Sequence, residues 1–339
     1  MTRVRLPLND MVGVLEAAGE ATRLRLLVLL AEAELTVSEL MIILGQSQPR
    51  VSRHLRLLTE AGLAQRHREG AWAFFRLRDD GPAVALAKTF HAHLDPLDAL
   101  LAADRGRLAE VRRQRSDLAS AYFARHAATF DEIRALHVEE AQVEAALLGA
   151  IGRQTLGTLL DIGTGTGRML ELFAPQAASA LGVDQSPAML ALARARLEEA
   201  NIRNAQLRQG DVYVLPVEAD SQDLVIIHQV LHYLDEPARA LREAARTLSP
   251  GGRMVVVDFA PHEVESLRAD HAHRRLGFAR EEITAALLDA GLEVRGVKAL
   301  AARPGDAREL TVLIFVARDR RRTPATFFTK TLVNAREVL

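Results

Sequence analysis

Apolar residues in the first part of the chain recur at the spacing of an α-helix. They follow three- and four-residue intervals over residues 11–18 and again over 22–31, which predicts two amphipathic helices. Thr36 precedes a third apolar stretch, and Glu39 follows it by three residues, the arrangement of a capping box. Gly45 ends this stretch, so we expect a short third helix between Thr36 and Gly45.

The pattern then predicts one more helix, after which apolar and polar residues alternate. Ser47 can cap a fourth helix, with Pro49 allowed in its first turn, and Gly62 is a plausible stop signal. Apolar and polar residues alternate over 63–67 and 72–77, which predicts a β-hairpin. Two helices joined by a tight turn and followed by a hairpin predict a winged helix-turn-helix.

The fourth helix has one apolar face and one polar face. Val51, Leu55 and Leu58 are spaced to face the interior of the domain. The remaining side chains face outward, and arginine and glutamine at the start of such a helix can reach guanine and adenine edges in the major groove. The candidates for DNA contact are Gln48, Arg50, Ser52, Arg53, His54 and, on the hairpin, Arg68.

Positive charge gathers on this segment, although the whole chain has a formal net charge of only −1. Residues 45–78 contain seven arginines and two glutamates, a local net charge of +5. Arginines on a reading head neutralise phosphates and supply non-specific affinity for DNA. The alternative is a protein-interaction module whose arginines form a solvated surface.

The stretch from Leu35 to Leu77, which includes SQPRVSRHL, strongly resembles the ArsR/SmtB repressor family. The resemblance implies a double-stranded DNA operator as partner and a homodimer that presents two recognition helices. It also implies a dimer seam in the helical segment that follows the hairpin. The candidates for that seam are Val84, Leu86, Leu94, Leu97, Leu100 and Leu101.

The chain contains no cysteine, which excludes the thiolate metal sites that this family often uses. His91 and His93 follow the hairpin, and His137 with Glu140 forms an H-x-x-E pattern. The pattern of partner residues expected for a carboxylate–imidazole site is missing. We therefore interpret these histidines as surface or packing residues and expect no metal.

A second pattern begins in the middle of the chain. An apolar run over 156–162 leads into the glycine-rich turn from Gly163 to Gly167, and a helical pattern follows over 168–173. This predicts a buried strand, a tight turn and the start of a helix. Asp184 ends the next apolar stretch, where a carboxylate is placed to accept hydrogen bonds from ribose hydroxyls. Alternating strands and helices then predict a parallel sheet with helices on both faces.

Five segments from this region resemble class I S-adenosylmethionine (SAM) methyltransferases: DIGTGTG, VDQSPAML, GDVYVLP, DLVIIHQVLHYLDEP and LSPGGRMVVVD. The resemblance covers residues 119–318 and implies a Rossmann-like seven-stranded α/β domain that binds SAM or S-adenosylhomocysteine (SAH). The third glycine stands at 167 rather than 168, so the dinucleotide fingerprint is not met. The cofactor-binding residues implied are Asp161, Gly163, Thr164, Gly165, Gly167, Asp184, Gln185, Asp211, Val212 and His228.

Methyl transfer mainly requires that donor and acceptor are aligned and that water is excluded. His228 and His232 are the candidate catalytic bases, His271 is a further candidate, and Tyr233 is a candidate orienting group. Residues 118–131 resemble the lid segment of UbiE-like methyltransferases. Their aromatic residues could close over a ligand or serve as core anchors; these are Tyr122, Phe123 and Phe130.

The patterns divide the chain into four parts. These are a winged-helix domain over 1–83, a helical dimerisation and linker segment over 84–117, a methyltransferase domain over 118–318 and a mobile tail over 319–339. Residues 108–117 carry charges on most faces, and we expect them to form an exposed bridge between the domains.

The start of the chain has no signal-peptide pattern, and no apolar run reaches the roughly 20 residues that span a bilayer. We therefore expect a cytoplasmic location and no membrane contact. Two functions stay open. In one, the chain is a transcriptional regulator whose DNA binding is modulated by SAM or SAH. In the other, it is an active methyltransferase of a small molecule with the winged helix as a targeting or autoregulatory module. Arsenite as acceptor is disfavoured, because that chemistry uses several cysteines.

Overall fold

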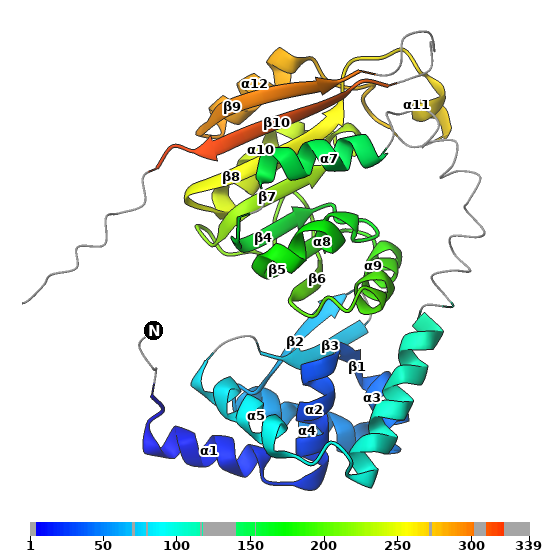
Figure 1. Ribbon diagram of the computed structural model, residues 1–339, viewed down its shortest axis with the longest axis vertical. Coiled ribbons are helices and arrows are strands. Elements are labelled where there is room, and N and C mark those ends of the chain that lie inside the picture. Colours follow the sequence, from blue (N-terminus) through cyan, green and yellow to red (C-terminus); the bar gives the residue numbers. More distant parts are fainter. Residues whose placement is uncertain are drawn as a thin grey trace, which may run out of the picture.

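The computed structural model describes residues 5–69, 72–78, 81–115, 117, 140–152, 154–270, 273–301 and 310–321. Figure 1 shows a smaller, mainly helical domain in blue and cyan below a larger domain built on one sheet, in green to orange. The expected lid aromatics and His271 lie outside the described residues.

The smaller domain has the order of elements that the sequence predicts. Its three-stranded sheet has the order β1-β3-β2, and both pairings are antiparallel. The elements are α1 (Leu8–Ala18), α2 (Ala21–Glu32), β1 (Leu35–Thr36), α3 (Val37–Leu44), α4 (Gln48–Glu60), β2 (Ala64–Glu69) and β3 (Trp72–Leu77). Helix α3, a short turn, helix α4 and the β2–β3 hairpin form a winged helix-turn-helix.

Local capping fixes where these helices begin and end. The Thr36 hydroxyl oxygen accepts from the Glu39 N–H at 3.2 Å, while the Thr36 N–H donates to the Glu39 carboxylate at 2.7 Å, so the capping box is confirmed. Helix α3 ends at Gly45, whose φ of 65° is left-handed and favours glycine. Ser47 occupies the N-cap of α4 but makes no side-chain capping bond.

The segment after the hairpin packs on the winged helix. It consists of α5 (Pro82–His93) and a helix over residues 99–115. Leu108 and Val111 are buried in the same core as α2 and α4, and Arg112 donates to the Glu32 carbonyl at 2.7 Å. The prediction of an exposed bridge over 108–117 was wrong, because two apolar residues three apart pack inward while the arginines bind carbonyls and carboxylates.

The larger domain contains a seven-stranded sheet of order β6-β5-β4-β7-β8-β10-β9. Strand β10 runs antiparallel to both neighbours, and the other pairings are parallel. The strands are β4 (Leu156–Ile162), β5 (Ala177–Asp184), β6 (Ala205–Gln209), β7 (Gln222–His228), β8 (Leu248–Phe259), β9 (Leu292–Leu300) and β10 (Val312–Asp319). The predicted seven-stranded Rossmann-like sheet is confirmed, and the antiparallel strand was not foreseen.

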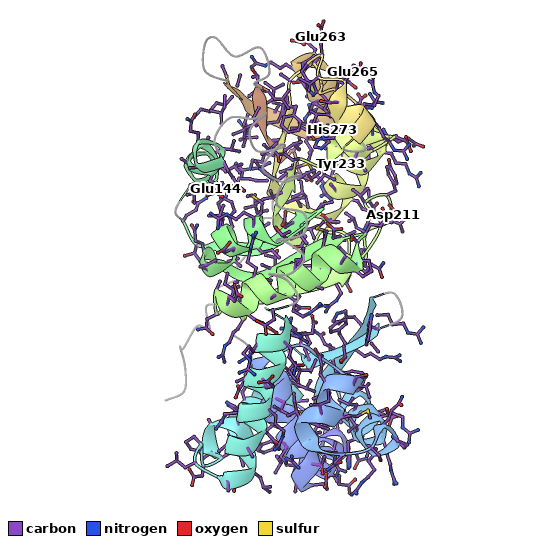
Figure 2. The ribbon with its side chains drawn as sticks, turned by 90° about the vertical axis from the view of Figure 1, so that its right-hand side faces the viewer. Glu144, Asp211, Tyr233, Glu263, Glu265 and His273 are labelled. Carbon is purple, nitrogen blue, oxygen red and sulfur yellow. The ribbon has the colours of Figure 1, made fainter. Side chains whose placement is uncertain are left out.

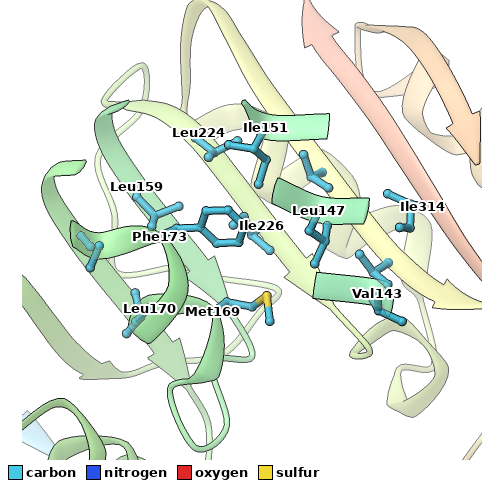
Figure 3. Packing of buried hydrophobic residues seen from close by; sticks show 14 of the residues in the cluster. Val143, Leu147, Ile151, Leu159, Met169, Leu170, Phe173, Leu224, Ile226 and Ile314 are labelled. Carbon is cyan, nitrogen blue, oxygen red and sulfur yellow. The ribbon is translucent and has the colours of Figure 1, made fainter. Parts of the chain in front are cut away.

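Helices cover both faces of this sheet. They are α7 (Glu140–Ile151), α8 (Arg168–Phe173), α9 (Pro187–Glu199), α10 (Pro237–Thr247), α11 (Ser266–Asp270) and α12 (Arg280–Asp289), with 3-10 turns over Ala174–Gln176 and Leu231–Tyr233. Figure 3 shows one core, in which Leu147 of α7 and Phe173 of α8 pack against Ile226 of β7. On the other face, Leu241 and Phe278 belong to a second core. Chain order reverses between β4 and β7, and in such sheets ligands bind where the strands on either side of that point end.

The sheet holds the chain beyond the predicted domain boundary at 318. Asp319 is buried, and Arg321 binds its carboxylate, the Asp220 carboxylate at 2.7 Å and the Leu248 carbonyl at 2.8 Å. The predicted tail therefore does not begin at 319, and the residues from 322 onward lie outside the described residues. Among the helices that are described, none combines the length and apolarity needed to cross a bilayer.

Candidate functional site

The turn after β4 is a conformation that only glycine adopts readily. Gly163, Gly165 and Gly167 have φ angles of 68°, 52° and 79°, all in the left-handed region. A Cβ at Gly163 would also lie 2.4 Å from a methyl carbon of Val230. The sequence therefore needs glycine at 163 both for backbone conformation and for space.

Asp184, at the end of β5, is tied to this turn. Its Oδ2 accepts from the Gly165 N–H at 2.8 Å, and its Oδ1 accepts from the Ser186 N–H at 2.8 Å. Each carboxylate oxygen can accept more than one hydrogen bond. Asp184 can thus hold the turn and still accept hydrogen bonds from hydroxyl groups of a ligand.

Asp161, near the end of β4, is an acid in an unusual environment. It is 1% exposed and accepts from the Thr164 hydroxyl at 2.6 Å. Burial raises the pKa of Asp161 to about 7; the Thr164 hydrogen bond opposes this rise, and the nearby charge of Asp184 adds to it. A cationic group of a ligand beside Asp161 would favour its ionised form.

These residues line a cavity of about 1290 Å³ at the carboxyl ends of the strands. Of the predicted cofactor residues, the following line it: Asp161, Gly163, Thr164, Gly165, Asp184, Gln185, Val212 and His228. Two others do not. Gly167 packs beside Ala193, and Asp211 is exposed and accepts from the Tyr213 N–H at 2.9 Å.

The cavity wall is acidic. Among the residues that the structure describes, two arginines line it, and both bind protein oxygens. Arg168 donates to Glu144 at 2.6 and 2.8 Å and to Glu171 at 2.7 Å, and Arg196 donates to the Thr166 hydroxyl at 2.9 Å. The carboxyl groups in the lining are Glu140, Glu144, Asp161, Glu171 and Asp184. Such a wall suits a ligand with hydroxyl and cationic groups and disfavours a pyrophosphate.

The two candidate bases have different surroundings. His228 lines the cavity, and burial lowers its pKa to about 4, so its imidazole is neutral at neutral pH. His232 is 2% exposed, hydrogen-bonds through Nδ1 to Asp258 at 2.8 Å and is absent from the cavity lining. Its ring stacks on His273 at 4.1 Å between centroids. Tyr233 does line the cavity, and Figure 2 shows it near His273 in the upper domain.

Sequence reasoning missed several lining residues. Glu144 and Arg168 form a two-bond ion pair across the pocket rim, from α7 to α8. No spacing along the chain signals this pair, because its members come from elements brought together only by the sheet. Met189 and Arg196 lie on one side of α9, seven residues apart, and the helical spacing alone could have suggested that they share a face.

The predicted DNA-reading face is largely exposed. Gln48, Arg50, Ser52 and Arg53 are exposed on α4, and Arg68 is exposed on β2. The expectation that His54 shares this exposure was wrong. Its side chain is only 14% exposed and lies 3.6 Å from the carboxylate of Glu20, the residue that caps the start of α2.

Burial lowers the pKa of His54, although the Glu20 charge opposes this effect. Within the described ranges, no group of three or more histidines, cysteines or acids is arranged to hold a metal ion.

Two family models match separate parts of the chain. Residues 20–66 match the bacterial regulatory protein, arsR family, and residues 160–256 match a methyltransferase domain. The chain is 27% identical over 208 residues to an uncharacterized 37.1 kDa protein in transposon TN4556 of Streptomyces fradiae, across 57% of this chain and 60% of that protein. It is 33% identical over 106 residues to the uncharacterized methyltransferase YcgJ of Bacillus subtilis, across 31% of this chain and 42% of YcgJ.

The matched regions thus span about 40 to 60% of the length of these curated relatives. The solved structure of YcgJ from Bacillus subtilis is similar at a TM-score of 0.46 and 19% identity, across 54% of this chain and all of YcgJ. Haemonchus contortus phosphoethanolamine N-methyltransferase 2 in complex with SAM is similar at a TM-score of 0.46 and 16% identity, across 54% and 53% of the two chains. From its two family matches and its seven-stranded sheet, the chain combines an ArsR-family helix-turn-helix domain with a class I methyltransferase domain.

Proposed function

We propose that this protein is a DNA-binding transcriptional regulator whose methyltransferase domain binds SAM or SAH and whose DNA affinity changes when that ligand is bound. One observation carries the proposal. The helix α4 exposes the polar side chains of Gln48, Arg50, Ser52 and Arg53 at its start. The side chains at the beginning of a recognition helix are those that reach base edges in the major groove.

The cavity supports SAM or SAH as the ligand. Asp184 would accept hydrogen bonds from the ribose hydroxyls, and Gly163 and Gly165 allow the backbone to approach the ligand. Asp161 and the other carboxyl groups of the wall favour a ligand that carries a sulfonium and an ammonium group. SAM has both cations, whereas SAH has only the ammonium group. The wall therefore gives a physical reason for the two ligands to bind with different affinity.

A homodimer is part of this proposal. Leu97 is 85% exposed and Leu100 is 58% exposed at the start of the helix over 99–115, and three apolar residues of α1 are also exposed, namely Leu8, Val12 and Leu15. Exposed apolar patches mark association sites. Of the predicted seam, Val84 and Leu101 are instead buried within the chain itself. Two copies joined at these leucines would present two α4 helices to two half-sites of an operator.

A specific observation also supports the enzyme alternative. The cavity bounded by the described residues, about 1290 Å³, exceeds the roughly 300–1,000 Å³ of most ligand pockets. A methyl acceptor could share it with SAM, which supplies an electrophilic methyl group when bound. His228 lines this space and, neutral at neutral pH, could orient an acceptor by a hydrogen bond, while its pKa of about 4 makes it a weak base.

Fluorescence anisotropy tests the proposal. The full chain is titrated onto labelled DNA from upstream of its own gene, without ligand, with SAM and with SAH. We expect the Kd for DNA to differ among the three titrations. Tight ligand binding with an unchanged Kd for DNA would refute the regulator and direct the search to a methyl acceptor.

A further inference from the structure

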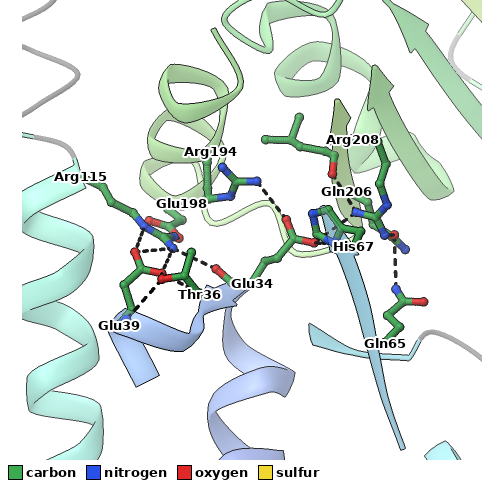
Figure 4. A network of polar contacts seen from close by, with 11 residues as sticks. Glu34, Thr36, Glu39, Gln65, His67, Arg115, Arg194, Glu198, Gln206 and Arg208 are labelled. Carbon is green, nitrogen blue, oxygen red and sulfur yellow. Dashed lines mark hydrogen bonds and ion pairs between the residues drawn. The ribbon is translucent and has the colours of Figure 1, made fainter. Parts of the chain in front are cut away.

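One face of the wing packs against the methyltransferase domain. Figure 4 shows side chains of the winged helix facing α9 and β6 of the sheet domain. We call this contact the domain joint. It consists of Glu34, His67 and Phe74 from the winged helix and Arg194, Gln206 and Arg208 from the methyltransferase domain.

Glu34 is the centre of the joint. Its side chain is 13% exposed and lies 3.2 Å from Arg194, 3.2 Å from Arg208 and 3.3 Å from a ring nitrogen of His67. Burial acts to raise the pKa of Glu34, but the charges of these neighbours outweigh it and the pKa is lowered. A buried carboxylate of the winged helix held by two arginines of the other domain makes the relative position of the domains specific, because any displacement leaves a buried charge without its partner.

The wing supplies the rest of the contact. The Arg194 guanidinium lies 4.0 Å from the centre of the Phe74 ring, and Phe74 is buried. The Gln65 side-chain amide donates to Gln206 at 3.4 Å. Gln65 and His67 point to this face of β2, since alternate residues of a strand share a face. Arg68, on the opposite face, is exposed with the DNA-reading residues.

A second contact crosses the same boundary. Arg115, at the end of the helix over 99–115, donates to the Glu39 carboxylate at 2.8 and 2.9 Å and to the Glu34 carbonyl at 3.0 Å. The same guanidinium is paired with Glu198 of α9. Helix α9 is thus held by the winged helix through both Arg194 and Glu198.

The elements that make the joint also build the ligand pocket. Ser186 caps the start of α9 beside Asp184, and Met189 and Arg196 of α9 line the cavity. At the end of β6, the Gln209 side-chain amide donates to the Gln185 carbonyl at 3.0 Å, and the Gly210 N–H donates to the Asp184 carbonyl at 3.0 Å.

We propose that the domain joint transmits occupancy of the pocket to the DNA-reading face. This inference rests on the proposed function and adds the path by which ligand binding changes the affinity for DNA. A ligand that binds Asp184 affects the start of α9 and the end of β6. The same two elements carry the joint residues Arg194, Gln206 and Arg208. A buried ion-pair cluster has discrete arrangements rather than a continuous range. If the ligand and DNA each bind better to one arrangement of the joint, the binding of one changes the affinity for the other.

The test compares two matched variants of α2 and the loop that follows it. Glu34→Gln removes the charge at the centre of the joint but keeps the shape of the side chain. Glu32→Gln is the control, because Glu32 pairs with Arg105 at 3.3 Å inside the DNA-binding part of the chain. The Kd for upstream DNA is measured by anisotropy for each protein with and without SAM and SAH, and the Kd for SAM is measured by calorimetry with and without DNA.

We expect the ligand to change the DNA Kd of wild type and of Glu32→Gln by the same factor, on the order of 5- to 150-fold as is typical of allosteric coupling. In Glu34→Gln the DNA Kd values with and without ligand should agree to within about twofold, and DNA should no longer change the SAM affinity. A Glu34→Gln protein that keeps the wild-type factor overturns the route alone. A wild type without any ligand effect refutes the proposed function instead.

A tether gives a second test if Glu34→Gln fails to fold. The chain has no cysteine, so Gln65→Cys with Gln206→Cys introduces the sole thiol pair, which a short bismaleimide can join. The tethered protein should bind DNA with one Kd whatever the ligand, while the untethered double variant, which keeps Glu34 beside Arg194 and Arg208, still responds to the ligand. A tethered protein that still responds, or thiols that cannot be joined, would overturn the joint as the route.

Discussion

Replacing Asp161 with asparagine should remove a specific pH dependence from the stability of the protein. Asp161 is buried at the end of β4 and accepts from the Thr164 hydroxyl at 2.6 Å. Asparagine keeps an oxygen that can accept this hydrogen bond and loses the ionisable group. Because burial raises the pKa of Asp161 from 3.8 to about 7, the folded protein holds this proton more tightly than the unfolded chain.

The sign and size follow from linkage. An acid with a raised folded-state pKa contributes stability that is fully present below its unfolded pKa and is lost as pH rises through its folded pKa. Each unit of pKa difference corresponds to ~1.4 kcal/mol, so the contribution falls by ~4 kcal/mol between pH 3.8 and about 7. Between pH 5 and 7 the loss is ~2 kcal/mol, because the folded state is already half ionised at pH 7, and this corresponds to roughly 4–8 °C in Tm for a domain of this size.

Differential scanning calorimetry of the full chain at pH 5 and 7 measures this change. From pH 5 to pH 7, the Tm of wild type should fall further than the Tm of Asp161→Asn by that amount. All other titrating groups are shared by the two proteins. Asp289→Asn, which removes an exposed carboxylate at the end of α12, is the control. Wild type and Asp161→Asn curves that shift in parallel would show that Asp161 is ionised at both pH values, and the reasoning from burial would be wrong.

Three further predictions concern the ligand, DNA and dimer sites. Asp184→Ala removes an acceptor for ribose hydroxyls and should weaken SAM binding at least tenfold by calorimetry while circular dichroism stays native; an unchanged affinity would refute the pocket assignment. Arg53→Ala should weaken binding to the upstream DNA by about 1–3 kcal/mol, and more than it weakens binding to unrelated DNA; an unchanged affinity, or an equal loss on both DNAs, would remove Arg53 from the base-reading face. Leu100→Glu should convert a dimer to a monomer in light scattering with little change in Tm, because Leu100 is exposed; a dimer that persists would place the seam elsewhere.

Local chemistry made much of the fold predictable. The capping box at Thr36, the left-handed glycine at 45 and the apolar face of α4 each act within a few residues of sequence, and each is found in the structure. The glycine turn and Asp184 follow from the order of strand, turn and helix in the same way.

Contacts between distant segments were not predictable from such patterns. The charged residues over 108–117 looked exposed, yet Arg115 meets Glu198 across 83 positions of sequence. His54 looked like a surface residue because its helix face was judged without Glu20, which caps the start of α2. The ion pair of Glu144 with Arg168 depends on where α7 lies on the sheet. In each case the partner is set by tertiary packing rather than by spacing.

The place of the wing beside β6 also bears on how this chain tolerates dissection. Strand β6 is at one end of the sheet order, and it contacts β2, as Figure 1 shows. An uncovered terminal strand offers unpaired backbone groups to other chains and promotes aggregation. Cutting the protein between its domains would therefore expose both that strand and the buried charges of Arg194 and Arg208. We therefore expect the isolated methyltransferase domain to self-associate more readily than the full chain, in which the winged helix covers β6.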